Sequence, residues 1–587
     1  MRGLLFGFRL FPLFSCGLAF LWMTAACKST NHPSRTESLS EDADEAATQM
    51  QSVVRFRGLF HQIASAQGFK REEIDQMIFL PSPEQLTTPS EALMAATPAA
   101  VNEALAQHLR PFSSSSLYKN GKDAPLPPAV DLEKIFKDKG PVTFVVIPGI
   151  FGEFLNTGPE AFPFSGVYGE KGRFRRDWQK SLRGIKASAY DLTSLATVEA
   201  DLSERVQLGS IDFSDSSLGS KVQVVYLNAV WGSLESLGSI EDIAQLNLER
   251  LEKALNMIPS DQLRNVYLIG YSRGAPVALE MAYQALARPK DFPSLRGLKG
   301  IVSLAGVVHG TALADDAFDH PDAPTYKVLK SLKTTLDGIK VYEKGDGYIS
   351  ASNKVLKNGL EIFQFALDTA DVKDKFTIPA GLLAENIKVE TADPFFVVGY
   401  AFQAFQSVFA APSTTVLNRL NNIKRAQMLL SKMLEGAEQL RTGARSAWWA
   451  AHILPPQLEV YALAGSMPEV TVNGVQSVLL SSPYYGSKTL DYAATLRKSA
   501  YALYELSGVS QNDSQVIESQ VRFWPRLMPL FNPQQPPLNF YHMGVVGTHH
   551  WGLAFPVAIK SKGGEVNPFP REMLLETMGA FVLGDKH

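Results

Sequence analysis

The sequence predicts an α/β fold in which a mostly parallel sheet is flanked by helices. Short runs of apolar residues recur along the chain, and amphipathic segments with helical spacing separate several of them. Uninterrupted apolar runs are typical of strands covered on both faces. The pentapeptide Gly270-Tyr271-Ser272-Arg273-Gly274 also stands between such a run and a helix-like segment, which indicates a sharp strand-to-helix turn.

Six apolar segments are expected to form the strands of this sheet. Between the second and the third of them, Ser239 and Asp242 have the spacing of a capping box, which predicts the start of a helix. The apolar residues that follow recur at helical spacing and give this helix one face toward the sheet. The expected strands are residues 142–147, 222–227, 266–269, 300–305, 458–463 and 540–546.

Changes in composition divide the chain into six parts. Helical-looking segments, separated by prolines, precede the first strand and predict a helical N-terminal extension. The strand pattern stops between the fourth and fifth strands, so a largely helical insertion over the strand ends is expected there, either a cap or lid or a plain structural subdomain. The parts are 1–26 (signal peptide), 27–50 (lipidated N-terminus and flexible tether), 51–140 (helical extension), 141–314 (first part of the core), 315–457 (insertion) and 458–587 (second part of the core).

The first residues have the pattern of a secretory signal peptide. Arg2 and Arg9 precede an apolar stretch over residues 10–26 that ends in small residues before Cys27. Cys16 and Cys27 are the only cysteines, so cleavage before Cys27 would make it the first residue of the mature chain. This pattern resembles the lipobox of bacterial lipoproteins, with Thr24 where such motifs prefer leucine.

The lipobox resemblance implies a lipid on Cys27 and export across the inner membrane. We expect the protein to be anchored at a membrane surface of the bacterial cell envelope, on the outer membrane or the periplasmic face. An ordinary secretory signal, giving a secreted protein with an incidental cysteine, is one alternative, and an uncleaved anchor helix is another. Residues 28–50 are polar without an apolar period, which predicts the flexible tether.

Composition and motifs give no sign of a nucleic-acid partner, a metal site or a cofactor site. The net charge of −3 leaves no basic footprint, so no nucleic-acid partner is expected. No Cys/His cluster has the spacing of a zinc site, and the sequence shows neither a glycine-rich phosphate loop nor a dinucleotide fingerprint. We therefore expect no metal and no other cofactor.

Ser272 is the leading candidate for chemistry. Strand, G-x-S-x-G and helix in this order form a nucleophile elbow, which holds a serine on a sharp turn above the sheet edge. The glycines serve where a Cβ would block the turn or the close passage of strand and helix. A serine hydroxyl is a weak nucleophile until a base takes its proton, so a histidine has to come close to Ser272 in space.

Two adjacent histidines, His549 and His550, directly follow the last expected strand. Neighbouring side chains on an extended loop point in different directions, so at most one of them serves as the base, and both can instead merely hydrogen-bond the loop. The sequence His-Trp-Gly-Leu resembles the His-x-Gly-Leu turn of small bacterial lipases. This resemblance selects His550 as the base and leaves His549 as the alternative, while His309 resembles a pocket-wall histidine of lipase-like sequences.

The base needs a carboxylate that fixes its tautomer and stabilises the imidazolium. Asp513 falls between the last two expected strands, in a segment that begins Asn512-Asp513-Ser514. This segment resembles the Asn-Asp-Gly-x-Val sequence that carries the acid in many lipases, with Ser514 in place of the glycine. Glu469, just past the strand at 458–463, is the main competitor.

Backbone donors for the developing oxyanion are expected from two loops. The residue after the nucleophile, Arg273, supplies one N–H group. The segment that starts Pro148-Gly149-Ile150 resembles the His-Gly-x-x-Gly oxyanion segment with proline in place of histidine. Ile150 N–H is therefore expected to be the second donor.

Together these segments resemble the lipase and esterase branch of the α/β-hydrolase superfamily, over about residues 141–314 and 458–587. The resemblance implies an α/β-hydrolase sheet and a serine hydrolase that cleaves carboxylic esters, including those of lipids, through an acyl-enzyme on Ser272. The same residues suit an acyltransferase, or an amidase or peptidase. The alternative from a different class is a non-catalytic surface binding protein on a hydrolase scaffold.

Overall fold

The computed structural model describes the parts of the chain that form the sheet and its covering helices. These are residues 35–108, 126–149, 185–188, 206–213, 222–227, 238–319, 435–466, 500–553 and 571–584, with short gaps at 67, 76, 82–85, 96, 257–259, 501–502, 505, 510–511 and 549. Short strand segments at 340–342, 348–350, 376–377, 388–389, 469–472, 475–478, 558–559 and 565–566 are also described.

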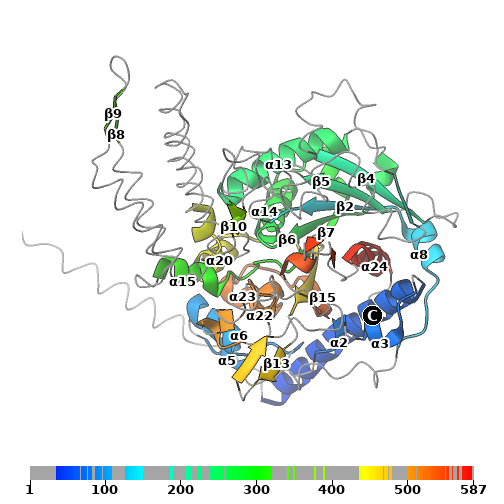
Figure 1. Cartoon of the computed structure of the whole chain (residues 1–587), viewed down its shortest axis with the longest axis horizontal. Helices are drawn as coiled ribbons and strands as arrows, with labels where there is room; N and C mark the ends of the chain where they lie inside the picture. The colour runs from blue at the N-terminus through cyan, green and yellow to red at the C-terminus, as the bar shows by residue number, and fades with distance from the viewer. Residues whose placement is uncertain are drawn as a thin grey trace, which may run out of the picture.

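A nine-stranded sheet runs through the centre of the molecule (Figure 1). It contains the six expected strands, each parallel to its neighbours among them. The prediction of a mostly parallel α/β sheet is therefore confirmed. In spatial order these strands are β5 (Val222–Leu227), β2 (Val142–Ile147), β6 (Val266–Tyr271), β7 (Leu298–Leu304), β12 (Glu459–Gly465) and β15 (Asn539–Val546).

Antiparallel strands complete the sheet at both edges. β4 (Val206–Phe213) pairs with β5 and is followed outward by β3 (Ile185–Ser188). At the other edge, β1 (Ile78–Phe79) pairs with the end of β15. The sequence pattern predicts none of the three, and β1 is too short to show any alternation. Because β1 comes from the N-terminal extension, the extension is part of the sheet.

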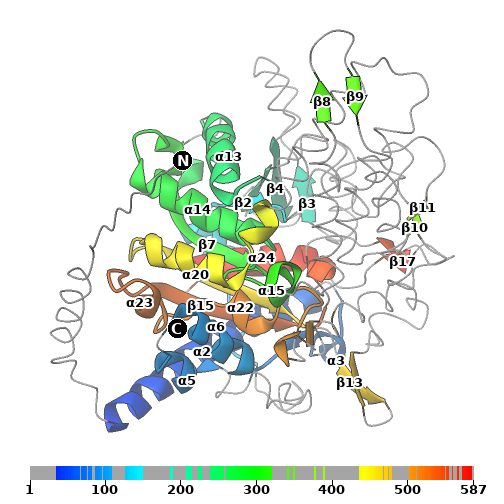
Figure 2. The ribbon, with the colours of Figure 1, turned by 90° about the vertical axis from the view of Figure 1, so that its left-hand side faces the viewer.

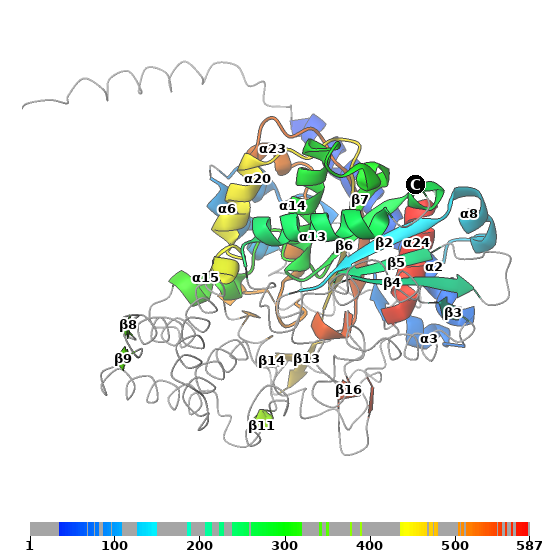
Figure 3. The same ribbon diagram turned by 90° about the horizontal axis from the view of Figure 1, so that it is seen from above.

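Helices cover both faces of the sheet and bury two apolar cores. α13 (Ile240–Leu255) and α14 (Gly274–Ala287) lie on one face (Figure 3). α13 begins directly after Ser239, whose side chain accepts the backbone N–H of Asp242, the bond that the capping-box spacing predicts. The opposite face carries α2 (Arg35–Ala66), α8 (Leu132–Lys139) and α24 (Arg571–Leu583).

The other described elements are smaller. α20 (Thr442–Ala451) lies beside α6 (Pro98–His108) and α23 (Met528–Phe531). The remaining helical elements are α3 (Arg71–Ile74), α5 (Ser90–Leu93), α15 (Ala312–Asp319), α22 (Glu518–Val521), η3 (Ser260–Leu263), η4 (Pro293–Gly297) and η5 (His550–Leu553). Four hairpins pair β8 (Lys340–Tyr342) with β9 (Tyr348–Ser350), β10 (Phe376–Thr377) with β11 (Lys388–Val389), β13 (Glu469–Val472) with β14 (Val475–Val478), and β16 (Ala558–Ile559) with β17 (Glu565–Val566).

The N-terminal helix α2 lies against β15, whose outer side pairs with β1 only at Val545 and Val546 (Figure 2). The Gln49 amide donates to Phe540 O at 3.2 Å and accepts the N–H of His542 at 2.9 Å, so a side chain satisfies part of the strand edge. Composition predicts a flexible tether over residues 27–50, whereas residues 35–50 form the first half of α2. The segment is helical rather than flexible because it contacts β15, almost five hundred residues away in the sequence. Composition cannot reveal such a contact.

The expected helical insertion falls largely outside the described residues. Between α15 and α20, the structure describes the strands β8 to β11 and residues 435–441. Of the helices in the described ranges, none has the length and apolar character needed to cross a membrane. The expected signal peptide and Cys27 also lie outside the described residues.

Glu576 on α24 gives the fold a pH dependence. Its side chain is buried, and its Oε2 has no hydrogen-bond partner in the described part of the chain. Burial raises the pKa of this carboxyl from 4.5 to about 8. Between these values the folded chain binds a proton that the unfolded chain has released, so the free energy of unfolding falls as the pH rises through this window.

We expect Glu576→Gln to remove this dependence and to raise the free energy of unfolding at pH 7 by about 3 kcal/mol. Urea unfolding at pH 5, 7 and 8.5 measures the effect, with the exposed Glu249→Gln as the matched control. Equal stability of the Glu576→Gln variant and the wild type at every pH would contradict the prediction.

Candidate active site

Ser272 lies on the sharp turn between β6 and α14. Its φ of 54° is in the left-handed region that residues other than glycine rarely adopt. Two backbone hydrogen bonds hold the turn: Ser272 N–H donates to Leu304 O at 3.1 Å, and Ser272 O accepts Val307 N–H at 3.1 Å. A strained serine fixed by its neighbours at a strand-to-helix turn is the conformation expected of a nucleophile elbow.

Both glycines of the pentapeptide are required by close approaches. A Cβ on Gly270 would lie 2.3 Å from Ala275 Cα, where β6 and α14 pass each other. A Cβ on Gly274 would lie 2.3 Å from Ile147 O at the end of β2. No heavier residue fits either position without moving the backbone, which explains the glycine spacing around Ser272.

His550 and Asp513 are hydrogen bonded and buried. His550 Nδ1 lies 2.6 Å from Asp513 Oδ2, and His550 N–H donates to Asp513 O at 2.7 Å. His550 Nε2 is buried without a hydrogen-bond partner among the described residues. When the carboxylate accepts the Nδ1 proton, Nε2 carries the lone pair and can accept a proton from a nucleophile.

The acid turn, residues 512–517, orients the Asp513 carboxylate. Its Oδ1 accepts the N–H groups of Gln515 at 2.9 Å and Val516 at 2.8 Å. These two bonds leave Oδ2 directed at His550. A Cβ on Gly465, at the end of β12, would lie 3.1 Å from Asp513 Cβ, so the turn lies directly over that strand end.

Ser514 takes the conformation that glycine usually supplies in this turn. Its φ is 86°, and its N–H donates to the Asn512 side chain at 2.9 Å. The Asn512 side chain in turn donates to Ala500 O at 3.2 Å. The turn thus keeps a glycine-type geometry with serine in place, at the cost of local backbone strain.

Tyr271 places His550 next to the elbow. The Tyr271 hydroxyl donates to His550 O at 3.0 Å, and the two rings lie 5.0 Å apart. Tyr271 immediately precedes Ser272, so His550 contacts the residue next to the Ser272 turn. Sequence reasoning did not assign a role to Tyr271, and its position inside the pentapeptide is the only signal that would have found it.

The segment expected to supply an oxyanion donor runs past Ser272. A Cβ on Gly149 would lie 3.4 Å from Ser272 Oγ, so the backbone after β2 passes close to the hydroxyl. Ile150 itself lies outside the described residues. The buried Arg273 guanidinium donates to Gly238 O, just before α13, which anchors the residue that follows Ser272.

The other predicted site residues fall elsewhere. His549 and Cys27 lie outside the described residues. Glu469 begins β13, which pairs with β14 in a separate hairpin. The described residues contain no group of His, Cys, Asp or Glu side chains that could hold a metal ion.

His309 lies inside a cluster of aromatic side chains. Its ring stacks near Trp449 of α20 and Phe531 of α23, with centroid distances of 6.2 and 6.0 Å. Burial, together with the charge of Arg445, lowers the pKa of His309 to about 3. The ring is therefore neutral at physiological pH, and this position suits packing rather than proton transfer.

The sequence matches no protein-family model and no curated protein. Among solved structures, a metagenomic carboxyl esterase, MGS0156, has 13% identity and a TM-score of 0.38, covering 92% of this chain and 94% of the other. The lipase BlEst2 of Bacillus licheniformis in its mature form has 10% identity and a TM-score of 0.26, covering 70% of this chain and 85% of the other.

The propeptide form of the same lipase has 12% identity and a TM-score of 0.25, covering 68% of this chain and 52% of the other. Likeness at this level carries no argument about activity. The order and direction of the strands, with a nucleophile-type elbow after β6, are what define the architecture. On these grounds the chain has a mostly parallel α/β sheet flanked by helices.

Proposed function

We propose that this chain is a serine hydrolase that cleaves carboxylic esters, with Ser272 as nucleophile, His550 as general base and Asp513 as the acid that orients it. One observation carries the proposal: the residue before a serine in a left-handed turn, Tyr271, contacts the buried Asp513–His550 pair, whose Nε2 has no partner among the described residues. A structural hydrogen-bond pair would not need a strained serine next to it.

In the proposed reaction, Ser272 Oγ attacks the ester carbonyl carbon while His550 Nε2 takes the hydroxyl proton. Asp513 stabilises the resulting imidazolium through Nδ1. The N–H groups of Arg273 and Ile150 are the proposed donors to the oxyanion. His550 then gives its proton to the departing alcohol, and a water molecule, activated by the same imidazole, frees the acid from the acyl-enzyme.

Labelling with a fluorophosphonate probe tests the nucleophile. The wild type should be labelled and Ser272→Ala should not. Ser294→Ala, which removes a serine of η4 whose hydroxyl donates to Asn256, should be labelled like the wild type. Labelling that persists in Ser272→Ala would exclude the mechanism. Product partition between water and an added alcohol then distinguishes a hydrolase from an acyltransferase.

We also propose that Cys27 carries lipid and holds the protein at a membrane surface of the cell envelope, where esters of lipids are the proposed substrates. The proposal rests on the small residues before Cys27 and on the apolar stretch at 10–26. Growth with an alkyne fatty acid should label the wild type and Cys16→Ser, but not Cys27→Ser. Equal labelling of Cys27→Ser and the wild type would refute it.

A further inference from the structure

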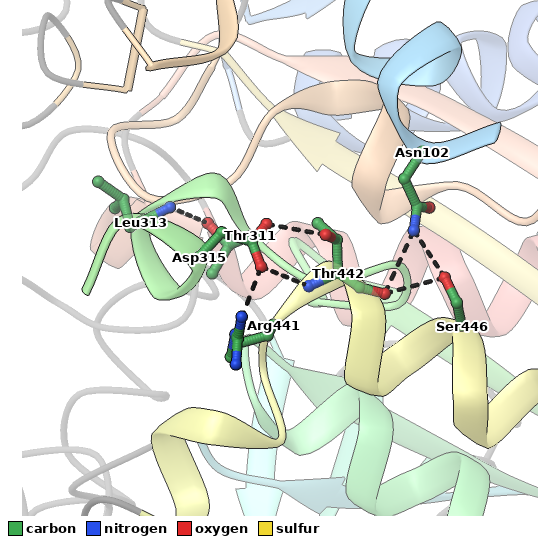
Figure 4. A network of polar contacts seen from close by, with 7 residues as sticks. All are labelled: Asn102, Thr311, Leu313, Asp315, Arg441, Thr442 and Ser446. Atoms are coloured by element: carbon green, nitrogen blue, oxygen red, sulfur yellow. Dashed lines mark hydrogen bonds and ion pairs between the residues drawn. The ribbon is translucent and has the colours of Figure 1, made fainter. Parts of the chain in front are cut away.

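The two ends of the insertion meet at one place (Figure 4). Asp315 of α15 accepts the Thr442 N–H at 3.0 Å and the Thr442 hydroxyl at 2.8 Å. Arg441 Nε lies 3.9 Å from the same carboxylate. The carboxylate therefore caps the start of α20 and joins two points that are 127 residues apart in the sequence.

Thr311 connects this place to the acid turn. Its N–H donates to Leu440 O at 2.9 Å, and its hydroxyl donates to Gln515 O at 2.9 Å. Gln515 is also a residue whose N–H binds Asp513 Oδ1. Thr311 thus binds Leu440 of the insertion through its backbone N–H, and it binds the peptide next to the Asp513 carboxylate through its side chain.

The same end of the insertion also contacts the nucleophile side of the site. The Gln439 side chain accepts the N–H of Ile240, the first residue of α13, at 2.6 Å. Two residues earlier, Gly238 O accepts the Arg273 guanidinium. We call residues 439–442 the junction. The junction contacts the start of α13, next to the residue that binds Arg273, and it contacts Thr311, which binds the acid turn.

The close approach of the junction to Thr311 requires glycine at position 310. Gly310 has a φ of 91°, and a Cβ on it would lie 2.5 Å from Thr442 Cα. Only glycine allows the chain before Thr311 to turn this closely against α20. The Thr311 side chain is then almost fully buried, which restricts its hydroxyl to these neighbours.

We propose that Thr311 is a positioning residue for the Asp513–His550 pair, held in place by the junction. This rests on the proposed function of that pair. Asp513 Oδ2 can stabilise the His550 imidazolium only while the acid turn keeps its orientation. The Thr311 hydroxyl holds that turn by donating to Gln515 O. The N–H of the same Gln515 orients the Asp513 carboxylate.

The comparison of Thr311→Val with Thr311→Ser tests the proposal, because valine removes the hydroxyl at nearly constant shape and serine keeps it. Thr311→Val should lower kcat/KM for a short-chain ester about fivefold, the loss expected from one hydrogen bond. The acidic limb of its pH profile should move to lower pH, since a displaced carboxylate stabilises the imidazolium less. Thr311→Ser should restore both values.

Thr577→Val is the matched control, because it removes another buried threonine hydroxyl, bonded to Met573 O within α24. Its pH profile should match the wild type. In an Asp513→Asn background, Thr311→Val should have no further effect, since both changes act through one carboxylate. If Thr311→Val does not fold, Thr311→Ala allows the same comparison.

The downfield NMR signal of the His550 Nδ1 proton gives a readout that does not need activity. Thr311→Val should shift it and Thr311→Ser should not. An unchanged signal and pH profile in Thr311→Val, or equal losses with serine and valine, would overturn the positioning role. If Thr311→Val shifts the signal but the wild type hydrolyses no ester and takes no fluorophosphonate, the positioning role is supported and the esterase proposal is contradicted.

Discussion

His550→Ala is expected to lower kcat for a carboxylic ester by about a million-fold, because the Ser272 hydroxyl then has no group to take its proton. The remaining rate should come from substrate binding and the oxyanion donors alone. Initial rates with a p-nitrophenyl ester, corrected for spontaneous hydrolysis, measure the loss. Urea unfolding of the same variant separates a loss of catalysis from a loss of fold.

His549→Ala is the matched control for this change. It removes the adjacent imidazole and keeps His550, so the rate should stay within about threefold of the wild type. The opposite outcome, in which His549→Ala abolishes activity and His550→Ala does not, would assign the base to His549.

Asp513→Asn is expected to lower kcat by about ten-thousand-fold with little change in KM. In the structure, Asp513 Oδ2 lies 2.6 Å from His550 Nδ1 and Oδ1 accepts two backbone N–H groups. An asparagine that keeps the two backbone bonds through its oxygen presents its NH₂ group to Nδ1. That reverses the donor and acceptor, so the proton is favoured on Nε2, where it blocks attack by Ser272.

Two variants control for the Asp513 change. Asp131→Asn replaces an aspartate that caps α8, where asparagine caps a helix about as well, so activity and stability should both be preserved. Glu469→Gln removes the rival acid and should leave the rate unchanged. A large loss in Glu469→Gln together with an active Asp513→Asn would move the acid to Glu469.

The parallel strands and the elbow were predictable because their signals are local. A run such as β2 or β6 is apolar without interruption since it is buried on both faces, and this is visible in six consecutive letters. The glycines of the elbow are visible for a similar reason, because each is required by backbone that lies within a few residues or at the end of the neighbouring strand.

The strands at the sheet edges and the role of the N-terminal extension were not predictable. β1 and Gln49 complete the edge of β15, and both are joined to it across more than four hundred residues. A two-residue strand is too short to show a sequence pattern, and Gln49 looks like any other polar residue of a flexible tether. Their roles become visible only through their contacts with β15.

By itself the sequence determined the fold class, the place of Ser272 and a short set of candidates for its base and acid, because these follow from strand periodicity, glycine geometry and local motifs. Only the tertiary structure decided that Asp513 binds His550, that Tyr271 binds His550 in turn, and that Thr311 joins the acid turn to Leu440 of the insertion. These contacts link loops far apart in the chain, and their distances are fixed by the packing of the whole sheet.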